Sequence, residues 1–365
     1  MTEQKYYGLI LAGGRGTRFW PRSRKRHAKQ VLAVGPESRK DGRDSLIQQT
    51  VDRLRPLIPP DRIWILTNGF VRDEIVRQLP EVPPDQIIAE PAQRNTAPAI
   101  DLAAHILASV DPEAVFGVFP SDHVIGNAEH YLDLVRPAFA SAEAGNIAVL
   151  GVAPRWPETG YGYIEFPKNA PLTPTSVTPV QRFREKPDEE TAKAYLASGN
   201  FYWNAGMFFW KAQTILDELQ RYLPKTAALI STLPAFTDPN FSASLAQVFP
   251  QCEDISIDFA VLERSVKVTG VPCDDFGWND VGSWQAVYEL LPRDAAANSK
   301  RSETIVMNAS GNYIDCGKKT VGLIGVNDLI IVDTPDALLV ADRNRAQDVG
   351  KLVKILEEMG REDLL

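Results

Sequence analysis

A glycine- and arginine-rich segment follows the first apolar stretch of the sequence. Residues 7–12 are apolar, residues 13–18 read GGRGTR, and residues 13–36 contain seven lysines and arginines and no acid. Glycines let backbone amides approach phosphate oxygens, and cationic side chains neutralise the phosphate charge. The segment therefore favours a polyphosphate site, with Arg18 and Lys29 as the cations that would serve it.

Two familiar phosphate-binding patterns do not fit this segment. The dinucleotide fingerprint needs a third glycine where Arg18 stands, and the Gly-Lys-Ser/Thr ending of the Walker pattern is missing. The alternative interpretation is a glycine turn followed by a solvated basic surface, since charge runs are often surface features. An acidic neighbour within the protein would match the same charge.

Two aspartates stand where metal chemistry could take place. Asp122 follows the apolar run 115–119, and the carboxyl ends of strands in an open parallel sheet are where ligands bind. Asp280 comes just before a predicted helix. Taken alone, each is an ordinary turn or cap residue. Together with phosphate oxygens, such carboxylates suit Mg²⁺.

Other polar residues occur at the ends or in the middle of predicted elements. Asn95 and Thr96 precede a helical pattern and can cap it. Glu185 and Lys186 end a predicted strand, where a lysine is ordinarily a surface cation. Asn204 lies inside an apolar strand pattern, and its amide needs partners, which a sugar hydroxyl or the backbone would provide.

The elements that must position these residues alternate along the first part of the chain. Apolar runs at 7–12, 63–67, 114–119 and 147–152 are separated by helix-like stretches, of which 128–142 is one. This alternation predicts βαβ units around a parallel sheet.

The middle of the chain changes pattern without a clear domain break. Strands are predicted at 163–166, 180–186 and 202–210, with a helix at 189–198. We interpret this section as an insertion plus closing elements of the same domain, which we place at 1–292.

The last part of the chain predicts a small second domain at 293–365. A polar linker covers 294–302, and 304–341 holds short β-rich runs with glycine and Asp/Asn turns. A one-sided apolar pattern predicts a final helix at 345–359. These strands and one helix offer little area for an independent core, so we expect this domain to pack on the large domain or on a second subunit.

Composition is that of an ordinary globular protein. Of the 365 residues, 44% are hydrophobic and 24% charged, and 39 lysines and arginines face 47 acids for a net charge of −8. The acidic balance disfavours nucleic-acid and anionic-membrane partners.

Cysteine and histidine usage excludes several classes. Cys252, Cys273 and Cys316 are too few and scattered for a disulfide framework or a cysteine-based zinc site, so a reducing cytoplasm is the expected location. The four histidines have no metal spacing, and no Gly-x-Ser-x-Gly elbow occurs. No apolar run approaches the ~20 residues that span a bilayer.

The glycine–arginine segment carries a family resemblance. Leu11-Ala12-Gly13-Gly14-x-Gly16-Thr17-Arg18 with a downstream Lys29 resembles the signature of sugar-phosphate nucleotidyltransferases. Trp20-Pro21, Ser23-Arg24 and Lys29-Gln30 resemble its mannose-1-phosphate guanylyltransferase branch, and so do segments 333–339 and 345–349. Ala28 stands where that branch usually has proline, which puts the rigidity of the loop in question.

The resemblance implies a fold and a set of site residues. The fold is a Rossmann-like α/β domain with a mixed, mainly parallel sheet, plus a small β-rich C-terminal domain. Catalytic roles fall to Arg18, Lys29 and Lys186, and Mg²⁺ to Asp122 and Asp280. The implied nucleotide-binding residues are Leu11, Ala12, Gly13, Gly14, Gly16, Thr17, Arg18, Asn95, Thr96, Ser121 and Asp122. The implied sugar-phosphate residues are Gly162, Glu185, Lys186 and Asn204.

The implied reaction transfers GMP from GTP to α-D-mannose 1-phosphate and releases pyrophosphate, in a Mg²⁺-dependent homodimer with only this activity. The second pKa of a phosphate monoester is about 6, so the nucleophile is already ionised at neutral pH and needs no protein base. Two alternatives stay open: a nucleotidyltransferase for another sugar 1-phosphate or base, and a non-catalytic nucleotide-sugar sensor.

Overall fold

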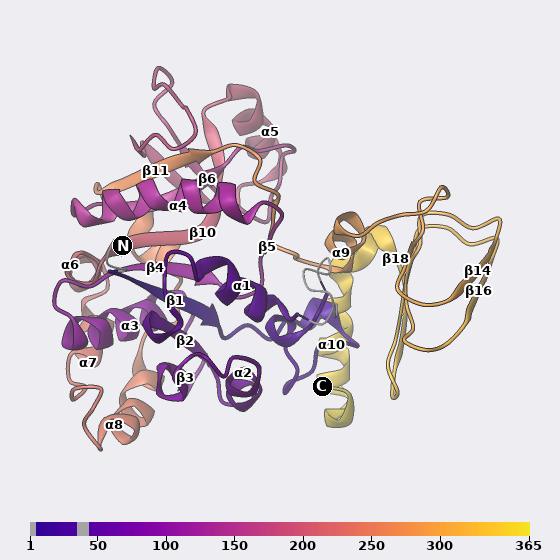
Figure 1. Cartoon of the computed structure of the whole chain (residues 1–365), viewed down its shortest axis with the longest axis horizontal. Coiled ribbons are helices and arrows are strands. Elements are labelled where there is room, and N and C mark those ends of the chain that lie inside the picture. The colour runs from indigo at the N-terminus through magenta and orange to yellow at the C-terminus, as the bar shows by residue number, and fades with distance from the viewer. Residues whose placement is uncertain (1–4, 35–43) are drawn as a thin grey trace.

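The computed structural model describes residues 5–34 and 44–365. Figure 1 shows a large α/β part and a smaller C-terminal part beside it, with α9 (Trp284–Leu290) and α10 (Val349–Glu358) where the two parts meet. No helix in the described residues combines the length and the apolar character needed to cross a membrane.

A twisted mixed sheet forms the centre of the large part. In spatial order its main path runs β3 (Ile87–Glu90), β2 (Ile63–Asn68), β1 (Tyr6–Ala12), β4 (Val115–Pro120), β10 (Phe201–Lys211), β6 (Ile147–Val152), β11 (Val268–Cys273) and β8 (Thr178–Pro179). The first four are parallel, and β6 and β11 are parallel to each other. The long strand β10 lies antiparallel between these two groups.

Three short pairings complete the large part. The strand β7 (Gly162–Glu165) pairs antiparallel with both β10 and β9 (Arg182–Glu185). Separately, β5 (Val124–Ile125) pairs antiparallel with β12 (Trp278–Asn279), which places Val124 opposite Asn279. This small ladder joins the end of β4 to a segment more than 150 residues later in the chain.

Helices cover both faces of the sheet because the strands are apolar on both sides. Successive residues of a strand point to opposite faces, and accordingly Ile10 of β1 belongs to one buried cluster and Leu9 to the other. On the Ile10 face lie α1 (Leu46–Leu54), α2 (Arg72–Gln78) and α4 (Ala128–Glu143). On the Leu9 face lie α3 (Thr96–Val110), α6 (Ala212–Tyr222), α7 (Pro224–Ile230) and α8 (Phe241–Val248). A further helix, α5 (Glu189–Ser198), lies beside β10.

The C-terminal part is a set of short stacked strands followed by a helix. One sheet has the order β13 (Ser299–Lys300), β15 (Tyr313–Asp315), β17 (Leu329–Asp333) and β18 (Leu338–Asp342), and a second pairs β14 (Thr304–Met307) with β16 (Val321–Ile324). Except for the β17–β18 pair, the strands run parallel.

The C-terminal part shares a core with the glycine–arginine segment. The Trp20 indole donates to the carbonyl of Leu364 at 2.9 Å, and the Trp284 indole donates to the carbonyl of Trp20 at 3.1 Å. Trp284 also stacks on Tyr313, with ring centroids 5.5 Å apart. The expectation that this part packs on the large one is thereby confirmed.

The fold class predicted from the sequence is confirmed, with local corrections. The strand predicted at 180–186 is shorter, because β9 ends at Glu185 and Lys186 has a left-handed backbone with φ 45°. The final helix begins at Val349, after a 3₁₀ segment at Arg343–Asp348. A short π-helix lies at Asp258–Leu262.

Candidate active site

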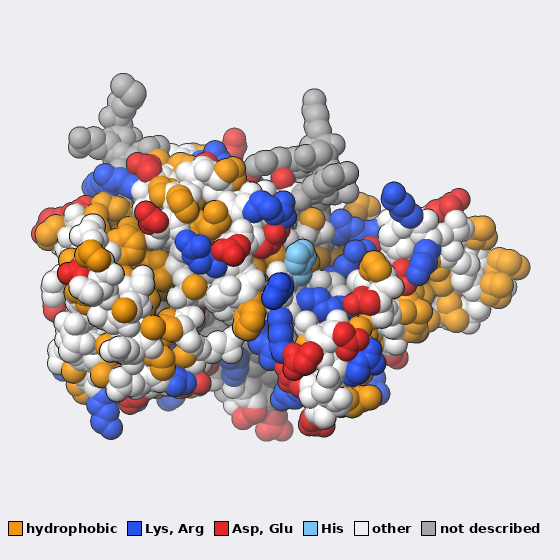
Figure 2. All heavy atoms as spheres, turned by 90° about the horizontal axis from the view of Figure 1, so that it is seen from below, with side chains coloured by type: hydrophobic (Ala, Val, Ile, Leu, Met, Phe, Trp, Pro, Cys, Tyr) orange, Lys and Arg blue, Asp and Glu red, His pale blue; other side chains and the backbone are white. Residues whose placement is uncertain are grey.

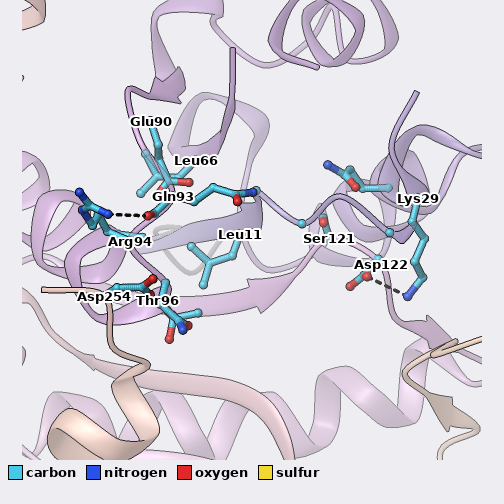
Figure 3. A pocket seen from close by; sticks show the side chains of 16 residues that line it. Leu11, Lys29, Leu66, Glu90, Gln93, Arg94, Thr96, Ser121, Asp122 and Asp254 are labelled. Carbon is cyan, nitrogen blue, oxygen red and sulfur yellow. Dashed lines mark hydrogen bonds and ion pairs between the residues drawn. The ribbon is translucent and has the colours of Figure 1, made fainter. Parts of the chain in front are cut away.

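Two adjoining cavities open at the carboxyl ends of β1 and β4. The first has a volume of about 450 Å³ and the second about 290 Å³, and both are lined by Leu11 and Thr96. Figure 3 shows the first cavity, with Lys29 and Asp122 at one end and Glu90, Gln93 and Arg94 towards the other. Ligands in open α/β sheets bind at this edge.

Most of the predicted nucleotide-binding residues line the first cavity. They are Leu11, Gly13, Gly14, Gly16, Asn95, Thr96, Ser121 and Asp122, together with the predicted catalytic Lys29. Ala12, Thr17 and Arg18 are not among its lining residues. Ala12 is buried in the sheet with 1% exposure, and its carbonyl accepts from the Gln30 amide at 2.6 Å.

Other residues approach two glycines of the loop closely. Gly16 has φ 63°, and a Cβ there would overlap the Cβ of Lys29. A Cβ on Gly13 would lie 2.9 Å from Oε2 of Glu90. The absence of side chains therefore lets the loop fold back on Lys29 and lets the Glu90 carboxyl lie against the loop backbone.

Lys29 connects the two predicted metal ligands. Its side chain is 7% exposed, and its Nζ donates to Oδ2 of Asp122 at 2.7 Å and to the carbonyl of Asp280 at 2.8 Å. The ladder of β5 and β12 explains why these aspartates come together, because Asp122 lies two residues before β5 and Asp280 one residue after β12. One ammonium thus lies between the two cavities.

The aspartates are held in different ways. Burial opposes ionisation of Asp122, but the nearby Lys29 ammonium outweighs it and holds the pKa of Asp122 below its usual value. Oδ1 of Asp280 accepts from the Tyr161 hydroxyl at 2.8 Å, and burial together with that carboxylate raises the pKa of Tyr161. Both carboxylates are therefore anchored by donors, Asp122 by the Lys29 ammonium and Asp280 by the Tyr161 hydroxyl.

These carboxylates fit a small divalent cation that also takes phosphate oxygens. No cluster of three or more His, Cys, Asp and Glu side chains occurs in residues 5–34 and 44–365, so the protein offers no complete metal cage there. Mg²⁺ characteristically uses one or two carboxylates, with substrate phosphates and water as its other ligands. Asp122 and Asp280 match that donor set.

Three of the four predicted sugar-phosphate residues line the second cavity. These are Gly162, Glu185 and Asn204. The fourth, Lys186, is outside the lining, with a side chain 63% exposed and its Nζ 3.0 Å from Oε1 of Glu185. Its role as a sugar-phosphate ligand stays a prediction.

Several lining residues were not predicted as site residues. In the second cavity, Asp258 accepts from the Asn204 amide at 3.1 Å, and burial together with Glu185 raises the pKa of Asp258 to about 7. Nδ1 of His123 accepts from the Trp278 indole at 3.2 Å, and burial lowers the pKa of His123 to about 4, so this imidazole is neutral. Asp258 reaches the cavity from the start of the short π-helix Asp258–Leu262.

Backbone strain marks three residues of the site. Asn95, Lys186 and Val281 have φ values of 64°, 45° and 47°, in a region that side-chain-bearing residues seldom adopt. At Val281 the turn is fixed by its own amide, which donates to the Asn279 side chain at 2.7 Å. Such strain tends to cluster at functional sites, and here it sets the direction of Asp280.

The charge excess of the glycine–arginine segment is largely matched inside the protein. Acidic side chains of the C-terminal part contact four of its cations, in the pairs Arg15–Glu357, Arg22–Asp315, Arg24–Asp336 and Lys25–Glu362. Figure 2 shows Lys and Arg side chains gathered where the two parts meet. The acidic neighbour that the sequence left as an alternative therefore exists for these four. Lys29 points into the site instead.

Arg18 lies at a third cavity of about 450 Å³ that is also lined by Tyr161, Asp280 and Gln347. Its Nη1 donates to Oε1 of Gln347 at 2.7 Å. Arg18 is therefore near the predicted metal ligand Asp280 rather than among the lining residues of the first cavity.

Comparisons with known proteins agree on one family. A family model described as nucleotidyl transferase matches residues 7–297, and one described as a MannoseP isomerase/GMP-like beta-helix domain matches 302–356. A mannose-1-phosphate guanylyltransferase of Klebsiella pneumoniae is 39% identical over 97% of this chain and 74% of its own length. One from Escherichia coli K12 is 38% identical over 100% of this chain and 76% of its own length.

A solved structure is similar over nearly the whole length. A Thermus thermophilus protein described as a mannose-1-phosphate geranyltransferase has a TM-score of 0.83 and 30% identity, and the match covers 97% of this chain and 99% of that one.

The buried Glu90 generates a prediction about stability and pH. Burial raises its pKa from 4.5 to about 8, so between these values the folded protein holds a proton that the unfolded chain has lost. Stability from this group is complete below pH 4.5 and is lost as pH rises towards 8. Glu90→Gln, which stays neutral, should gain on the order of 2 kcal/mol or more relative to wild type between pH 5 and 8.

Urea unfolding at several pH values measures this difference. Glu113→Gln is the matched control, because the Glu113 side chain is 84% exposed and the change should leave the pH curve as it is. Parallel curves for wild type and Glu90→Gln would contradict a buried neutral Glu90.

Proposed function

Since the chain belongs to the mannose-1-phosphate guanylyltransferase family of nucleotidyl transferases, we propose that the first cavity holds GTP and the second holds mannose 1-phosphate. The reaction is transfer of GMP from GTP to α-D-mannose 1-phosphate, which yields GDP-mannose and pyrophosphate. The observation that carries the assignment of the cavities is the Lys29 ammonium, which contacts Asp122 of the first cavity and Asp280 of the second.

The residues of this chain do the work of binding and charge neutralisation. A phosphate oxygen of the sugar phosphate attacks the α-phosphorus of GTP, and this oxygen is already ionised near neutral pH. Catalysis therefore needs positioning and stabilisation of negative charge. Lys29 is placed between the cavities for that task.

The glycine loop and a helix start would bind the triphosphate. Gly13, Gly14 and Gly16 expose backbone to the first cavity, and the N-terminal end of the 15-residue α3 faces it at Asn95 and Thr96. Helix N-termini attract anions through their unpaired amides. The Thr96 hydroxyl already accepts from the Ile257 amide at 2.9 Å, so its contribution is structural as well.

Mg²⁺ is the metal we propose for Asp122 and Asp280. When bound, it would neutralise charge that develops on the phosphates during transfer. The chain's own part is to hold both carboxylates in place, Asp122 through Lys29 and Asp280 through the Tyr161 hydroxyl.

For the sugar phosphate we propose that Glu185 and Asn204 bind its hydroxyl groups and that Lys186 binds its phosphate. The backbone of Gly162 would lie close to the sugar. A Cβ at Gly162 would overlap the Glu185 carboxyl, so a side chain there would displace Glu185 from its present position. The exposed Lys186 ammonium would have to leave Glu185 and turn towards the cavity on binding.

We also propose domains at 1–292 and 293–365 and a cytoplasmic location. The two family matches separate between residues 297 and 302, close to that boundary. The three cysteines are buried and free, which suits a reducing compartment.

An assay of pyrophosphate release tests the reaction. We expect release with mannose 1-phosphate and GTP, and much slower release when ATP, CTP or UTP replaces GTP or glucose 1-phosphate replaces mannose 1-phosphate. Equal rates with another pair of nucleotide and sugar phosphate would contradict the proposed specificity for GTP and mannose 1-phosphate. No release of pyrophosphate with any pair would favour the non-catalytic alternative.

Asp280→Asn should abolish most turnover while GTP still binds. Asparagine keeps the oxygen that accepts from Tyr161 and loses only the charge, so packing persists. Loss of ~3 kcal/mol of transition-state stabilisation lowers kcat by roughly 10² or more. The measurement is turnover across a magnesium titration, with GTP affinity in the same samples.

The control for this prediction is Asp275→Asn. That side chain is 70% exposed and lies five residues before Asp280, so its neutralisation should leave kcat unchanged. Full activity of Asp280→Asn at ordinary magnesium concentrations would remove Asp280 from the metal site.

We propose a homodimer formed through the β14–β16 pair. Ile305, Met307 and Ile324 on this pair are 62%, 57% and 70% exposed, and Figure 2 shows hydrophobic side chains at that end of the molecule. A second copy would cover both the apolar side chains and the strand edges.

Light scattering at micromolar concentration should give twice the 40.4 kDa chain mass for wild type. The combined change Ile305→Lys and Ile324→Lys should give the single-chain mass with its circular dichroism intact. A wild type that is already monomeric would contradict the dimer.

A further inference from the structure

Arg18 has a different kind of partner from Arg15, Arg22 and Arg24. Arg15, Arg22 and Arg24 each contact a carboxylate of the C-terminal part at 2.6, 2.5 and 3.1 Å. Arg18 instead donates to the uncharged amide oxygen of Gln347 at 2.7 Å. An amide takes one of the five donors of a guanidinium and leaves its charge uncompensated.

The backbone that carries Gln347 is anchored against the glycine–arginine segment. Its neighbours Ala346 and Val349 are buried in the same cluster as Phe19 and Trp20. A Cβ built on Gly350 would lie 3.5 Å from Cγ of Arg18, so the first turn of α10 packs on the arginine stem. Although its side chain is exposed, Gln347 therefore has a fixed base from which to orient Arg18.

Arg18 and Gln347 both line the third cavity, which Asp280 and Tyr161 connect to the second. A guanidinium held there with its full charge presents donors beside the residue proposed to carry the metal. A carboxylate at position 347 would neutralise it, as happens at Arg22 with Asp315.

We propose that Gln347 is a positioning residue through which the C-terminal domain holds Arg18, charged and oriented, for the phosphates of the nucleotide. This rests on the proposed function, because phosphate oxygens bound to a metal at Asp280 are the anions that Arg18 would meet in the third cavity. The C-terminal domain then takes part in nucleotide binding from outside the nucleotidyl transferase match, which ends at residue 297.

Gln347→Glu separates orientation from charge. The variant keeps an oxygen for the hydrogen bond and places a negative charge on Arg18, so the Kd and KM for GTP should rise about tenfold or more. Gln347→Ala keeps the charge and loses the orientation, so its effect should be a smaller rise of about three- to fivefold. GTP binding by calorimetry and steady-state kinetics measure both.

Two controls distinguish this role from a structural one. Asp336→Asn breaks the Arg24 pair at the same interface, and GTP affinity should not change. In an Arg18→Ala background, Gln347→Glu should have almost no further effect on GTP affinity, since the residues act as a unit. Melting temperatures confirm that each variant is folded.

The outcomes are decisive in either direction. Wild-type GTP affinity in Gln347→Glu, or an equal loss that persists in the Arg18→Ala background, would overturn the positioning role. Calorimetry measures GTP binding without any turnover, so it tests the role of Gln347 separately from the proposed reaction. If GTP binding depends on Gln347 and Arg18 but no pyrophosphate is released, only the proposed reaction is contradicted.

Discussion

A buried ammonium is the interaction on which the site depends. The Lys29 side chain is 7% exposed, and a cation removed from water is tolerated only when it is paired and hydrogen-bonded. Its two partners come from the end of β4 and from the segment after β12, and the short β5–β12 ladder brings these together. Because a single group needs both partners, the position of Lys29 fixes the glycine loop, Asp122 and Asp280 relative to one another.

Charge pairing extends this constraint to the C-terminal part. The glycine–arginine segment lies between the sheet and α10, and its arginines contact acids that come roughly 300 residues later in the chain. Surface pairs of this kind add little stability one by one, so the buried Trp20 and Trp284 contacts must provide most of the attachment. The acidic side chains of the C-terminal part instead determine which cations are available to a ligand. They pair with Arg15, Arg22 and Arg24, whereas Lys29 and Arg18 line the cavities.

Local sequence patterns predicted the elements well and the site in part. The runs at 63–67 and 147–152 became β2 and β6 because strands buried on both faces must be apolar throughout. Asp122 could be placed because it follows such a run. The contacts of Asp258, His123 and Gln347 could not be predicted. Each of these residues contacts a partner more than fifty residues away in the sequence, and such contacts leave no periodic pattern. The charge count also could not distinguish a phosphate ligand from an acidic side chain of the protein itself, and acids of the C-terminal part contact four of the seven cations.

The alanine at position 28 shows how the same loop geometry is reached without the proline that relatives were expected to carry. Proline would fix φ near −65°, and Ala28 has φ −69° with an extended ψ of 164°. Ala28 is 1% exposed and packs in the core with Val31, while the next residue is held by two hydrogen bonds through its side chain. Packing and the Lys29 contacts therefore supply the restraint that a pyrrolidine ring would add. The rigidity of this loop depends on the buried Lys29 ammonium more than on the residue before it. The backbone conformation at position 28 is therefore maintained by the same Lys29 contacts that hold Asp122 and Asp280 together.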